Sequence, residues 1–384
     1  LRNLAESEEV RSEAGAMTQK ENYRVLQGNC LDSLQSLESG SVNCCVTSPP
    51  YWGLRDYGTA IWKGGDVNCD HTISMPTKGN DPKRGTKYTR PEVASRGGDA
   101  SACHLCGAKR VDSQLGMEET PEEYVANMVK VFSEVKRVLT KEGTLWLNLG
   151  DSYAGNCSRT SSGRAGMGKE REGIYSRSGK GLKSKDLVGI PWRVAFALQA
   201  DGWYLRQDII WHKPNPMPES VTDRCTKSHE YIFLLSKSPK YYYDHEVIKE
   251  RCAESNIEDF KRRKTLDNKG KGKGTYEEAR PDLSRGRDAD MPDDFMRNKR
   301  SVWTVNTKPY PEAHFATFPK KLIRPCIHAG CPKGGVVLDP FGGSGTTAEV
   351  ANELQRDAIL CELNPEYCKL IEKRLSLTQM EMFV

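Results

Sequence analysis

Hydrophobic residues along the chain follow two patterns, short apolar runs and segments with a helical period. Val42–Thr47 is a run of strand length, whereas apolar side chains after Pro121 recur every three or four positions, which predicts a helix stopped by Lys141-Glu142-Gly143. Strands are predicted over residues 23–26, 42–47, 144–149, 204–211, 230–236, 336–339 and 357–361. Helices are predicted over residues 31–37, 121–139, 191–199 and 365–375. Two more are predicted beside the strand 336–339: one begins at residue 319 and precedes the strand, and the other follows the strand and ends at residue 354.

Strands that alternate with helices are typical of a doubly wound, mostly parallel sheet, so we predict an α/β fold. Residues 21–384 are expected to form one large domain, and residues 1–20 a disordered leader. Three polar inserts interrupt the alternation, at residues 63–115, 155–185 and 240–300. Long loops in a compact domain are often functional. The second insert holds eight basic and two acidic residues, which suits a polyanionic partner such as nucleic acid.

Composition excludes several classes of protein. No apolar run approaches the roughly 18 to 20 residues that a membrane span needs. The N-terminal residues are acidic and lack the apolar core of a secretory signal. Thirteen scattered cysteines without such a signal indicate reduced thiols and an intracellular protein rather than a disulfide framework. The net charge of +5 is mild, so the placement of the basic residues matters more than their number.

A glycine turn, residues 339–347 (Asp-Pro-Phe-Gly-Gly-Ser-Gly-Thr-Thr), follows the strand 336–339 and leads into a helix. Glycines there would let a ligand approach the backbone at the carboxyl edge of the sheet. A phosphate-binding loop would need a lysine that is missing, and the dinucleotide fingerprint matches only in part. A third reading is an S-adenosylmethionine site, with Asp339 facing the cationic methionine moiety and Glu362 ending the next strand to bind the ribose. A purely structural turn is the remaining alternative.

A proline motif, Ser48-Pro49-Pro50-Tyr51, follows the buried strand 42–47. Two successive prolines fix an extended backbone without N–H donors, so Ser48 and the proline carbonyls are presented as acceptors. Two acceptors on an exocyclic amine of a nucleobase would localise its lone pair for attack on a sulfonium methyl. Tyr51 would stack on a base swung out of the duplex. Pro-Pro-Tyr alone is more often a turn or a polyproline ligand.

Both motifs together resemble the amino-group DNA methyltransferases, which modify the N4 of cytosine or the N6 of adenine. Ser48–Tyr51 matches their catalytic motif and residues 339–347 match their cofactor motif, in the order of the permuted β group. The resemblance covers most of residues 23–375 and implies a Rossmann-like methyltransferase fold with a circularly permuted motif order. It also implies cofactor-binding roles for a set of residues: Asn29, Cys30, Phe318, Asp339, Phe341, Gly342, Gly343, Ser344, Gly345 and Glu362.

Two further parts of the chain are read through this resemblance. His314–Pro319 resembles the segment before the cofactor motif, which also touches the cofactor in that group. The first strand ends in Gly28-Asn29-Cys30, where the family usually has Gly-Asp, and Asn29 can still hydrogen-bond the adenosyl group. Residues 143–152 and 209–215, which include Asn148, Asp151 and Lys213, resemble other family blocks.

The resemblance implies catalytic roles for Ser48, Pro49, Pro50 and Tyr51 in site-specific methylation of double-stranded DNA. In this family the serine form of the motif goes mostly with cytosine N4 and the aspartate form mostly with adenine N6, so we favour cytosine N4. An RNA target and a non-catalytic DNA-binding protein stay open as alternatives. Methylation at cytosine C5 would need a cysteine nucleophile; Cys326 follows a proline, but it lies in a predicted helix and is interpreted as a core residue.

The insert 63–115 carries Cys69-Asp70-His71 and, after a gap of about 31 residues, Cys103-His104-Leu105-Cys106-Gly107. Cys-x-x-Cys-Gly is a common zinc knuckle, and Cys-x-His can supply two more tetrahedral ligands. We predict a structural zinc held by Cys69, His71, Cys103 and Cys106, although four ordinary loop residues remain the alternative. A catalytic zinc is not expected, because methyl transfer needs no activated water.

The resemblance also implies partners. Double-stranded DNA is the expected substrate, in the cytoplasm or nucleoid, and no membrane is involved. Target recognition is predicted in residues 240–300, helped by residues 155–185. The family contains both enzymes with a cognate restriction endonuclease and solitary ones, so an endonuclease partner and a homodimer both stay open.

Overall fold

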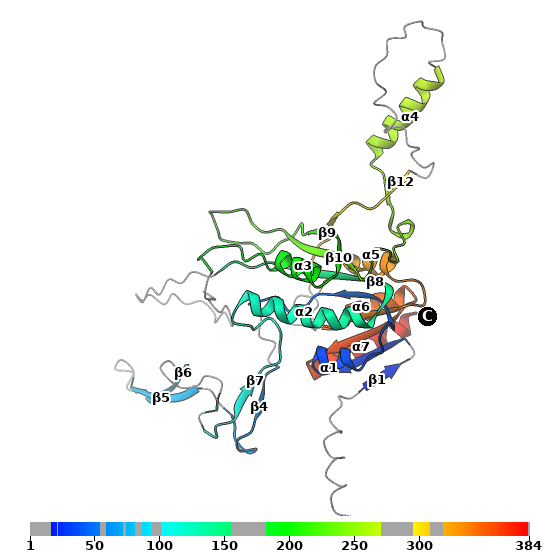
Figure 1. The fold of residues 1–384 in the computed structure, drawn as a ribbon. Helices are drawn as coiled ribbons and strands as arrows, with labels where there is room; N and C mark the ends of the chain where they lie inside the picture. The colour runs from blue at the N-terminus through cyan, green and yellow to red at the C-terminus, as the bar shows by residue number, and fades with distance from the viewer. Residues whose placement is uncertain are drawn as a thin grey trace, which may run out of the picture.

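A nine-stranded mixed sheet forms the centre of the protein in a computed structural model (Figure 1). The structure describes residues 17–20, 22–53, 59–71, 74–80, 87–93, 102–103, 105–154, 182–269, 295–307 and 318–382. In spatial order the strands are β1 (Met17–Lys20), β2 (Tyr23–Gln27), β15 (Asp357–Glu362), β14 (Val336–Asp339), β3 (Val42–Thr47), β8 (Leu139–Leu149), β10 (His229–Ser236), β9 (Tyr204–His212) and β13 (Val302–Thr304).

The five strands from β2 to β8 in this order run parallel. β10 then pairs antiparallel with both β8 and β9, and β13 runs parallel to β9. Because neighbouring parallel strands end at the same edge, the loops after β2, β15, β14, β3 and β8 meet on one side of the sheet. The predicted doubly wound, mostly parallel α/β fold is therefore confirmed.

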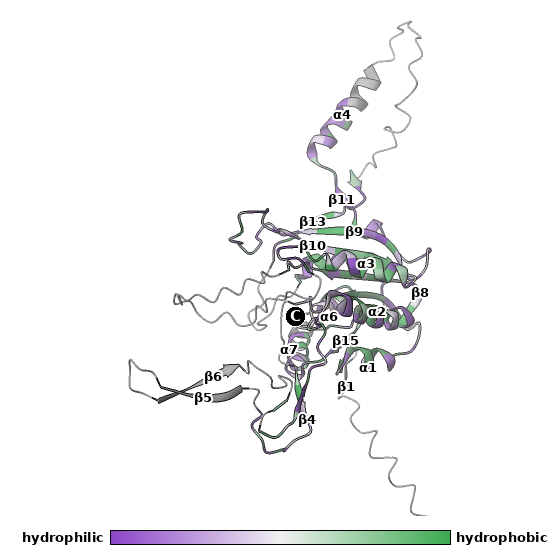
Figure 2. Ribbon diagram, turned by 60° about the vertical axis from the view of Figure 1, so that its left-hand side comes forward, coloured by the Kyte–Doolittle hydropathy of each residue, from purple (hydrophilic) through white to green (hydrophobic). Residues whose placement is uncertain are grey.

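Helices cover both faces of the sheet. α1 (Cys30–Gln35), α2 (Pro121–Val138) and α3 (Ile190–Ala200) pack on one face, and α5 (Lys320–Gly330), α6 (Thr346–Glu353) and α7 (Pro365–Met382) pack on the other. Successive strand residues alternate between the two apolar layers: Cys44 and Val46 contact the α5–α7 layer, whereas Cys45 faces the α1–α3 layer. In Figure 2 the green colour of hydrophobic residues is concentrated in the strands of the sheet and on the helices that pack against it.

Cys326 lies in α5 with 1% of its surface exposed, and burial raises the pKa of its thiol well above its usual value. A thiol that stays protonated inside the core cannot act as a nucleophile. Its interpretation as a core residue, made to exclude C5 methylation, agrees with this position.

The structure differs from the sequence prediction at three elements. Met17–Lys20 pair with Tyr23–Leu26, so the predicted leader over residues 1–20 is wrong for its last four residues, and residues 1–16 lie outside the described part. Lys141-Glu142-Gly143 do not end α2 but belong to β8, which begins at Leu139. α4 (Glu254–Lys269) forms within the insert 240–300, beside the short pair β11 (Glu250–Arg251) and β12 (Met296–Arg297).

Two of the inserts leave the body of the protein. The β11–β12 pair and α4 extend from the β9–β13 end of the sheet, and Figure 1 shows them reaching beyond the core. At the other end, β4 (Ile61–Lys63) pairs with β7 (Lys109–Val111), and β5 (Ser74–Asn80) pairs with β6 (Lys87–Val93). Most of the basic insert, residues 155–181, lies outside the described residues.

Candidate functional site

A cavity of about 890 Å³ opens at the carboxyl edge of the parallel strands. Its volume lies in the range of about 300–1,000 Å³ that is usual for small-molecule sites. The walls contain nearly all of the predicted site residues: Asn29, Cys30, Ser48, Pro49, Pro50, Tyr51, Phe318, Asp339, Phe341, Gly342, Gly343, Ser344 and Glu362. The proline motif and the glycine turn, far apart in the sequence, therefore share one cavity.

Asp339 ends β14 and lies at the centre of this arrangement, with 1% of its surface exposed. Its Oδ1 accepts from the Thr47 hydroxyl at 2.6 Å and from the Phe341 amide at 3.1 Å, and its Oδ2 accepts from the Thr347 hydroxyl at 2.6 Å. Burial raises the pKa of this carboxyl to about 6, although the three hydrogen bonds act in the opposite direction and lower it. Asp339 thus ties the strand that carries the proline motif to the glycine turn.

Glu362 ends β15 and holds the same turn from the other side. Its two carboxylate oxygens accept from the amides of Gly343 and Asn364, each at 2.8 Å. Burial raises the pKa of Glu362 to about 7, although both amides favour the charged form. Gly343 has a φ of +52°, a left-handed conformation that glycine adopts without strain.

Gly345, by contrast, does not line the cavity. It begins α6 as its N-cap with a φ of +80°, and a Cβ there would lie 3.2 Å from Ile371. Its role is therefore to let the helix start close against α7. Arg374 of α7 supports the turn by donating to the Ser344 carbonyl, the Ser344 hydroxyl and the Thr346 hydroxyl, each at 3.0 Å.

The end of β2 supplies another wall of the cavity. Asn29 is the N-cap of α1, and its Oδ1 accepts from the Leu31 amide at 2.9 Å. Burial raises the pKa of the neighbouring Cys30 thiol to about 12, so this side chain stays neutral. Phe318 also lines the cavity, whereas residues 314–317 of the predicted cofactor segment lie outside the described residues.

The proline motif begins directly after Thr47, the last residue of β3. The Pro50 carbonyl accepts from the Tyr124 hydroxyl of α2 at 2.9 Å. This bond anchors the motif to the helix layer, and it uses one of the proline carbonyls that the sequence suggested as acceptors for a substrate. Ser48 and the Pro49 carbonyl are the acceptors that remain for that role.

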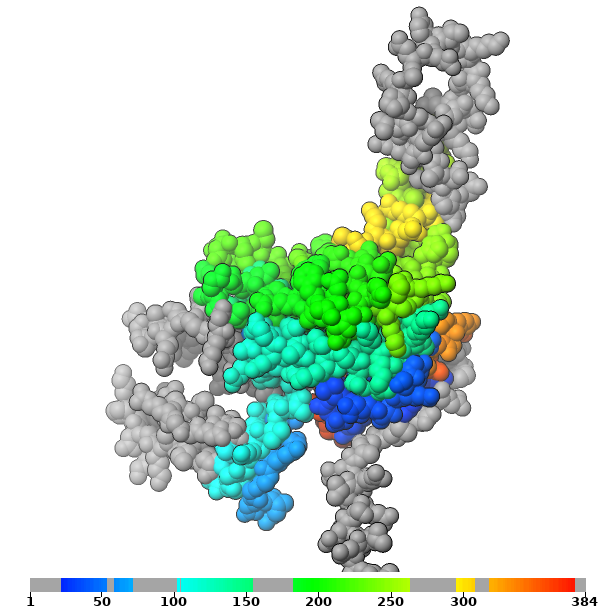
Figure 3. Space-filling model, viewed as in Figure 1, coloured from blue at the N-terminus to red at the C-terminus, as the bar shows by residue number. Residues whose placement is uncertain are grey.

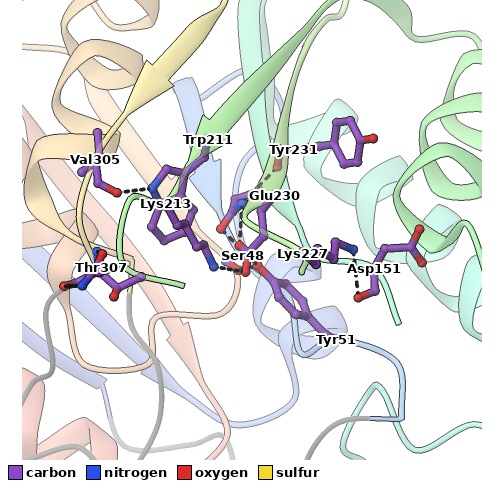
Figure 4. A network of polar contacts seen from close by, with 12 residues as sticks. Ser48, Tyr51, Asp151, Trp211, Lys213, Lys227, Glu230, Tyr231, Val305 and Thr307 are labelled. Atoms are coloured by element: carbon purple, nitrogen blue, oxygen red, sulfur yellow. Dashed lines mark hydrogen bonds and ion pairs between the residues drawn. The ribbon is translucent and has the colours of Figure 1, made fainter. Parts of the chain in front are cut away.

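Tyr51 belongs to a partly buried polar network (Figure 4). Its hydroxyl donates to Glu230 Oε2 at 2.8 Å and lies 3.2 Å from Asn148 Oδ1, while the Ser48 hydroxyl donates to it at 3.4 Å. Glu230 forms an ion pair with Lys213, whose ammonium lies 4.2 Å from the centre of the Trp211 ring. Burial and the Glu230 carboxylate both raise the pKa of Tyr51, so its hydroxyl remains a donor.

Asn148, Lys213 and Glu230 complete this network, and sequence reasoning assigned no role to any of them. Asn148 is 4% exposed and donates to Glu230 Oε2 at 3.3 Å and to the Tyr231 carbonyl at 3.0 Å. The sequence feature that could have pointed to this network is Glu230, a carboxylate placed directly before the apolar run 231–235. Its meaning depended on β10 lying beside β8, which the local sequence does not reveal.

The Tyr51 ring packs against Gly150. A Cβ at Gly150 would lie 2.5 Å from Cε2 of the ring, closer than any real contact. The Gly150→Ala variant should therefore displace the ring and lower kcat/KM for the nucleic-acid substrate by about 10- to 100-fold, a transition-state cost of about 1–3 kcal/mol. Steady-state kinetics with a fixed excess of cofactor measures this effect. Unchanged kcat/KM would show that the position of Tyr51 is not critical.

The four predicted zinc ligands also meet in the structure. Cys69, His71, Cys103 and Cys106 place one ligand atom each within 4.8 Å of all the others. This group, called the cysteine cluster below, lies in the insert 63–115 and not among the residues that line the cavity.

Among the helices that the structure describes, none is long and apolar enough to cross a membrane.

Comparison with known proteins agrees with this geometry. The sequence model of the DNA methylase family N6_N4_Mtase matches residues 42–373. The chain is 40% identical to the Type II methyltransferase M.Cfr9I of Citrobacter freundii, over 91% of this chain and 87% of that one. It is 39% identical to the Type II methyltransferase M.SmaI of Serratia marcescens, over 92% of this chain and 90% of that one.

Among solved structures, the PvuII DNA methyltransferase, described as cytosine-N4-specific, shares the fold with a TM-score of 0.52 and 16% identity. The alignment covers 93% of this chain and 87% of that chain. The family match spans both the proline motif and the glycine turn, which line the same cavity. The chain is a member of the N6/N4 family of amino-group DNA methyltransferases.

Proposed function

We propose that this enzyme transfers a methyl group from S-adenosylmethionine to the exocyclic N4 amine of cytosine in double-stranded DNA, at a specific site. The observation that carries the proposal is the shared cavity, in which the proline motif with Ser48 at its first position faces the glycine turn. In this family the serine form of the motif goes mostly with cytosine N4. Relatives named Type II methyltransferases support a role in a restriction–modification system, with a cognate endonuclease as partner.

The cavity fits the methyl donor in size and in chemistry. Glu362 can accept the ribose hydroxyls, Phe341 and Phe318 offer apolar surface, and the buried Asp339 places negative charge near a cation. When bound, S-adenosylmethionine supplies an electrophilic methyl group on a positively charged sulfur. The chain itself orients that group and excludes water from it.

Activation of the amine is assigned to the proline motif. Ser48 Oγ and the Pro49 carbonyl would accept the two N–H groups of the cytosine amine, which localises the nitrogen lone pair. The nitrogen then forms an N–C bond as the methyl–sulfur bond breaks, and that electron pair stays on sulfur. The methylated nitrogen, which briefly carries a positive charge, releases one proton to bulk water.

Positioning of the flipped base is assigned to Tyr51 and the residues that hold it. Gly150 packs against the ring, and the hydroxyl is fixed by Glu230. The ring is therefore held in place before the base arrives, which lowers the entropic cost of a stacked complex. Glu230 and Lys213 act through Tyr51 and are positioning residues.

The nature of the product tests this proposal. DNA from cells that express the chain would be digested and its nucleosides identified by mass spectrometry, with Ser48→Ala as the matched control. We expect N4-methylcytosine only with the unchanged enzyme. N6-methyladenine instead would overturn the base assignment while keeping the reaction, and the absence of both products would overturn methylation of DNA.

Cofactor affinity should also depend on pH. The pKa values are about 6 for Asp339 and about 7 for Glu362, so both carboxyls gain negative charge as the pH rises. A sulfonium cation binds more tightly to the charged forms, so its affinity should rise between about pH 5 and pH 8 and then level off. Calorimetric titration with S-adenosylmethionine measures this. The neutral thioether product is the control, and an equal pH dependence of both ligands would contradict an electrostatic role for these acids.

A further inference from the structure

The cysteine cluster has the spacing of a metal site. Cys69 Sγ lies 3.8 Å from Cys103 Sγ, and Cys106 Sγ lies 3.2 Å from His71 Nδ1. Around a tetrahedral zinc with Zn–S of about 2.3 Å, two sulfurs lie about 3.8 Å apart, and a sulfur and a nitrogen about 3.6 Å. The observed S–S separation equals the first value, and the observed S–N separation is about 0.4 Å shorter than the second.

The same distances exclude a disulfide, which needs its two sulfurs at about 2.05 Å. All three cysteines of the cluster are free thiols. Three thiols and an imidazole whose ligand atoms all lie within 4.8 Å of one another form a donor set that zinc binds in structural sites. A shared cation gives a reason for their convergence.

The backbone around the ligands is shaped for this arrangement. The Gly107 amide donates to the Cys103 carbonyl at 2.8 Å, and Gly107 has a φ of +74°, which closes the turn that carries Cys103 and Cys106. The Cys103 amide in turn donates to the Ala108 carbonyl at 2.7 Å. This tight turn directs both sulfurs of the Cys-x-x-Cys segment to the same side.

Gly65 closes the other side of the cluster. A Cβ on Gly65 would lie 2.7 Å from Cys106 Sγ and 2.8 Å from the Ala108 Cβ. The adjacent Gly64 has the same left-handed backbone, with φ of +74° against +75°, but a Cβ there would meet nothing within 4 Å. These two glycines therefore separate the effect of backbone strain from the effect of crowding at Cys106 and Ala108.

We propose that Cys69, His71, Cys103 and Cys106 bind one zinc ion in a closed, tetrahedral, structural site. With three thiolates and one imidazole, the ion has no open position for water, so it would act by fixing the chain. It would fasten residues 61–71 to residues 102–111, which are otherwise joined by the short β4–β7 pair. Figure 3 shows this unit standing away from the core, where it lacks support from the main sheet.

The fastened unit is joined to the segments beside the proline motif. Thr59 donates to Asp112 at 3.2 Å, the Gly53 amide donates to the Gly116 carbonyl at 2.9 Å, and Trp52 donates to the Glu118 carbonyl at 3.0 Å. Four residues of these segments line the cavity: Thr59, Ser113, Gln114 and Leu115. Zinc would thus hold the wall of the cavity that adjoins Tyr51, while the glycine turn lies on separate elements.

Metal content is the first test. The full chain, purified from cells supplied with zinc, should contain about one zinc per chain by mass spectrometry of the metal. Cys69→Ser and Cys103→Ser should each lose most of it. Cys225→Ser, which changes an exposed thiol outside the cluster, should retain it. A full chain without zinc that also takes up none when it is added after reduction would overturn the proposal.

The glycine pair gives a second test in proteins that remain folded. Gly65→Ala should lose zinc to a chelator at least about tenfold faster than Gly64→Ala, because only the first crowds a ligand. Equal rates would overturn the assigned ligand geometry.

Loss of zinc should raise KM for DNA and leave the affinity for S-adenosylmethionine within about twofold. Since zinc is measured directly, this result stands or falls separately from the proposed methylation of cytosine.

Discussion

Replacing Ser48 with alanine should lower kcat by about 100- to 1,000-fold, the usual effect of removing one polar group that stabilises a transition state. The loss falls on kcat because the bond between Ser48 and the amine strengthens as the nitrogen develops positive charge. Asp339 and Glu362 contact other parts of the cavity, so the affinity for S-adenosylmethionine should stay within about twofold. Single-turnover methylation with saturating DNA and cofactor measures the chemical step.

Ser41→Ala is the matched control for this variant. Ser41 is exposed, it bonds only locally to the Glu38 carbonyl at 2.7 Å, and it precedes the same strand, β3. Its kcat should remain normal. Normal single-turnover rates in both Ser48→Ala and Tyr51→Ala would refute the assignment of the proline motif as the catalytic element.

The second large effect is expected at Asp339. Asp339→Ala removes the acceptor of the Thr47 hydroxyl, the Thr347 hydroxyl and the Phe341 amide. Each buried group left unpaired should lower the free energy of unfolding by about 1–3 kcal/mol. The glycine turn loses its tie to β3 at the same time, so the affinity for S-adenosylmethionine should fall by about 10- to 100-fold. Denaturant titration and calorimetry measure the two effects.

Asp339→Asn separates the charge of this residue from its hydrogen bonds. An asparagine keeps the shape, its amide oxygen can still accept from Thr47 and Phe341, and its amide nitrogen can donate to a rotated Thr347 hydroxyl. Stability should therefore change little, whereas the affinity for the sulfonium donor should fall more than that for the neutral thioether. If Asp339→Ala bound the donor normally, the residue would have no part in forming the site.

The central elements were predictable because their signals are local. The apolar run 42–47 was predicted as a strand with the bounds that β3 has, and the helix from Pro121 differs from α2 only at its end. Both motifs lie at strand ends, and parallel strands end at a common edge. The meeting of Ser48 with the glycine turn therefore followed from the predicted topology and the order of the motifs.

The start of β8 shows where local signals fail. Lys141-Glu142-Gly143 has the composition of a turn, yet these residues continue the strand. Their carbonyls are used by distant partners: the Tyr242 amide donates to Glu142 at 2.9 Å, and the Lys237 amide donates to Gly143 at 3.3 Å. Such pairing outweighs the weak turn preference of three residues. The Glu230 network was missed for the same reason, since it depends on which strand lies beside β8.

β14 and β15 lie between β2 and β3, although β2 and β3 follow each other closely in the sequence. Thr47 and Asp339, whose hydrogen bond joins the two halves of the proposed active site, are 292 residues apart. At about 5–20 residues per second, roughly 15–60 s of synthesis pass between them. During that time the nascent chain has unpaired edges on both β2 and β3, which are natural targets for chaperones and for aggregation. With the proposed site, methylation can begin only after the last strands have entered the middle of the sheet, so a partly translated chain cannot methylate DNA.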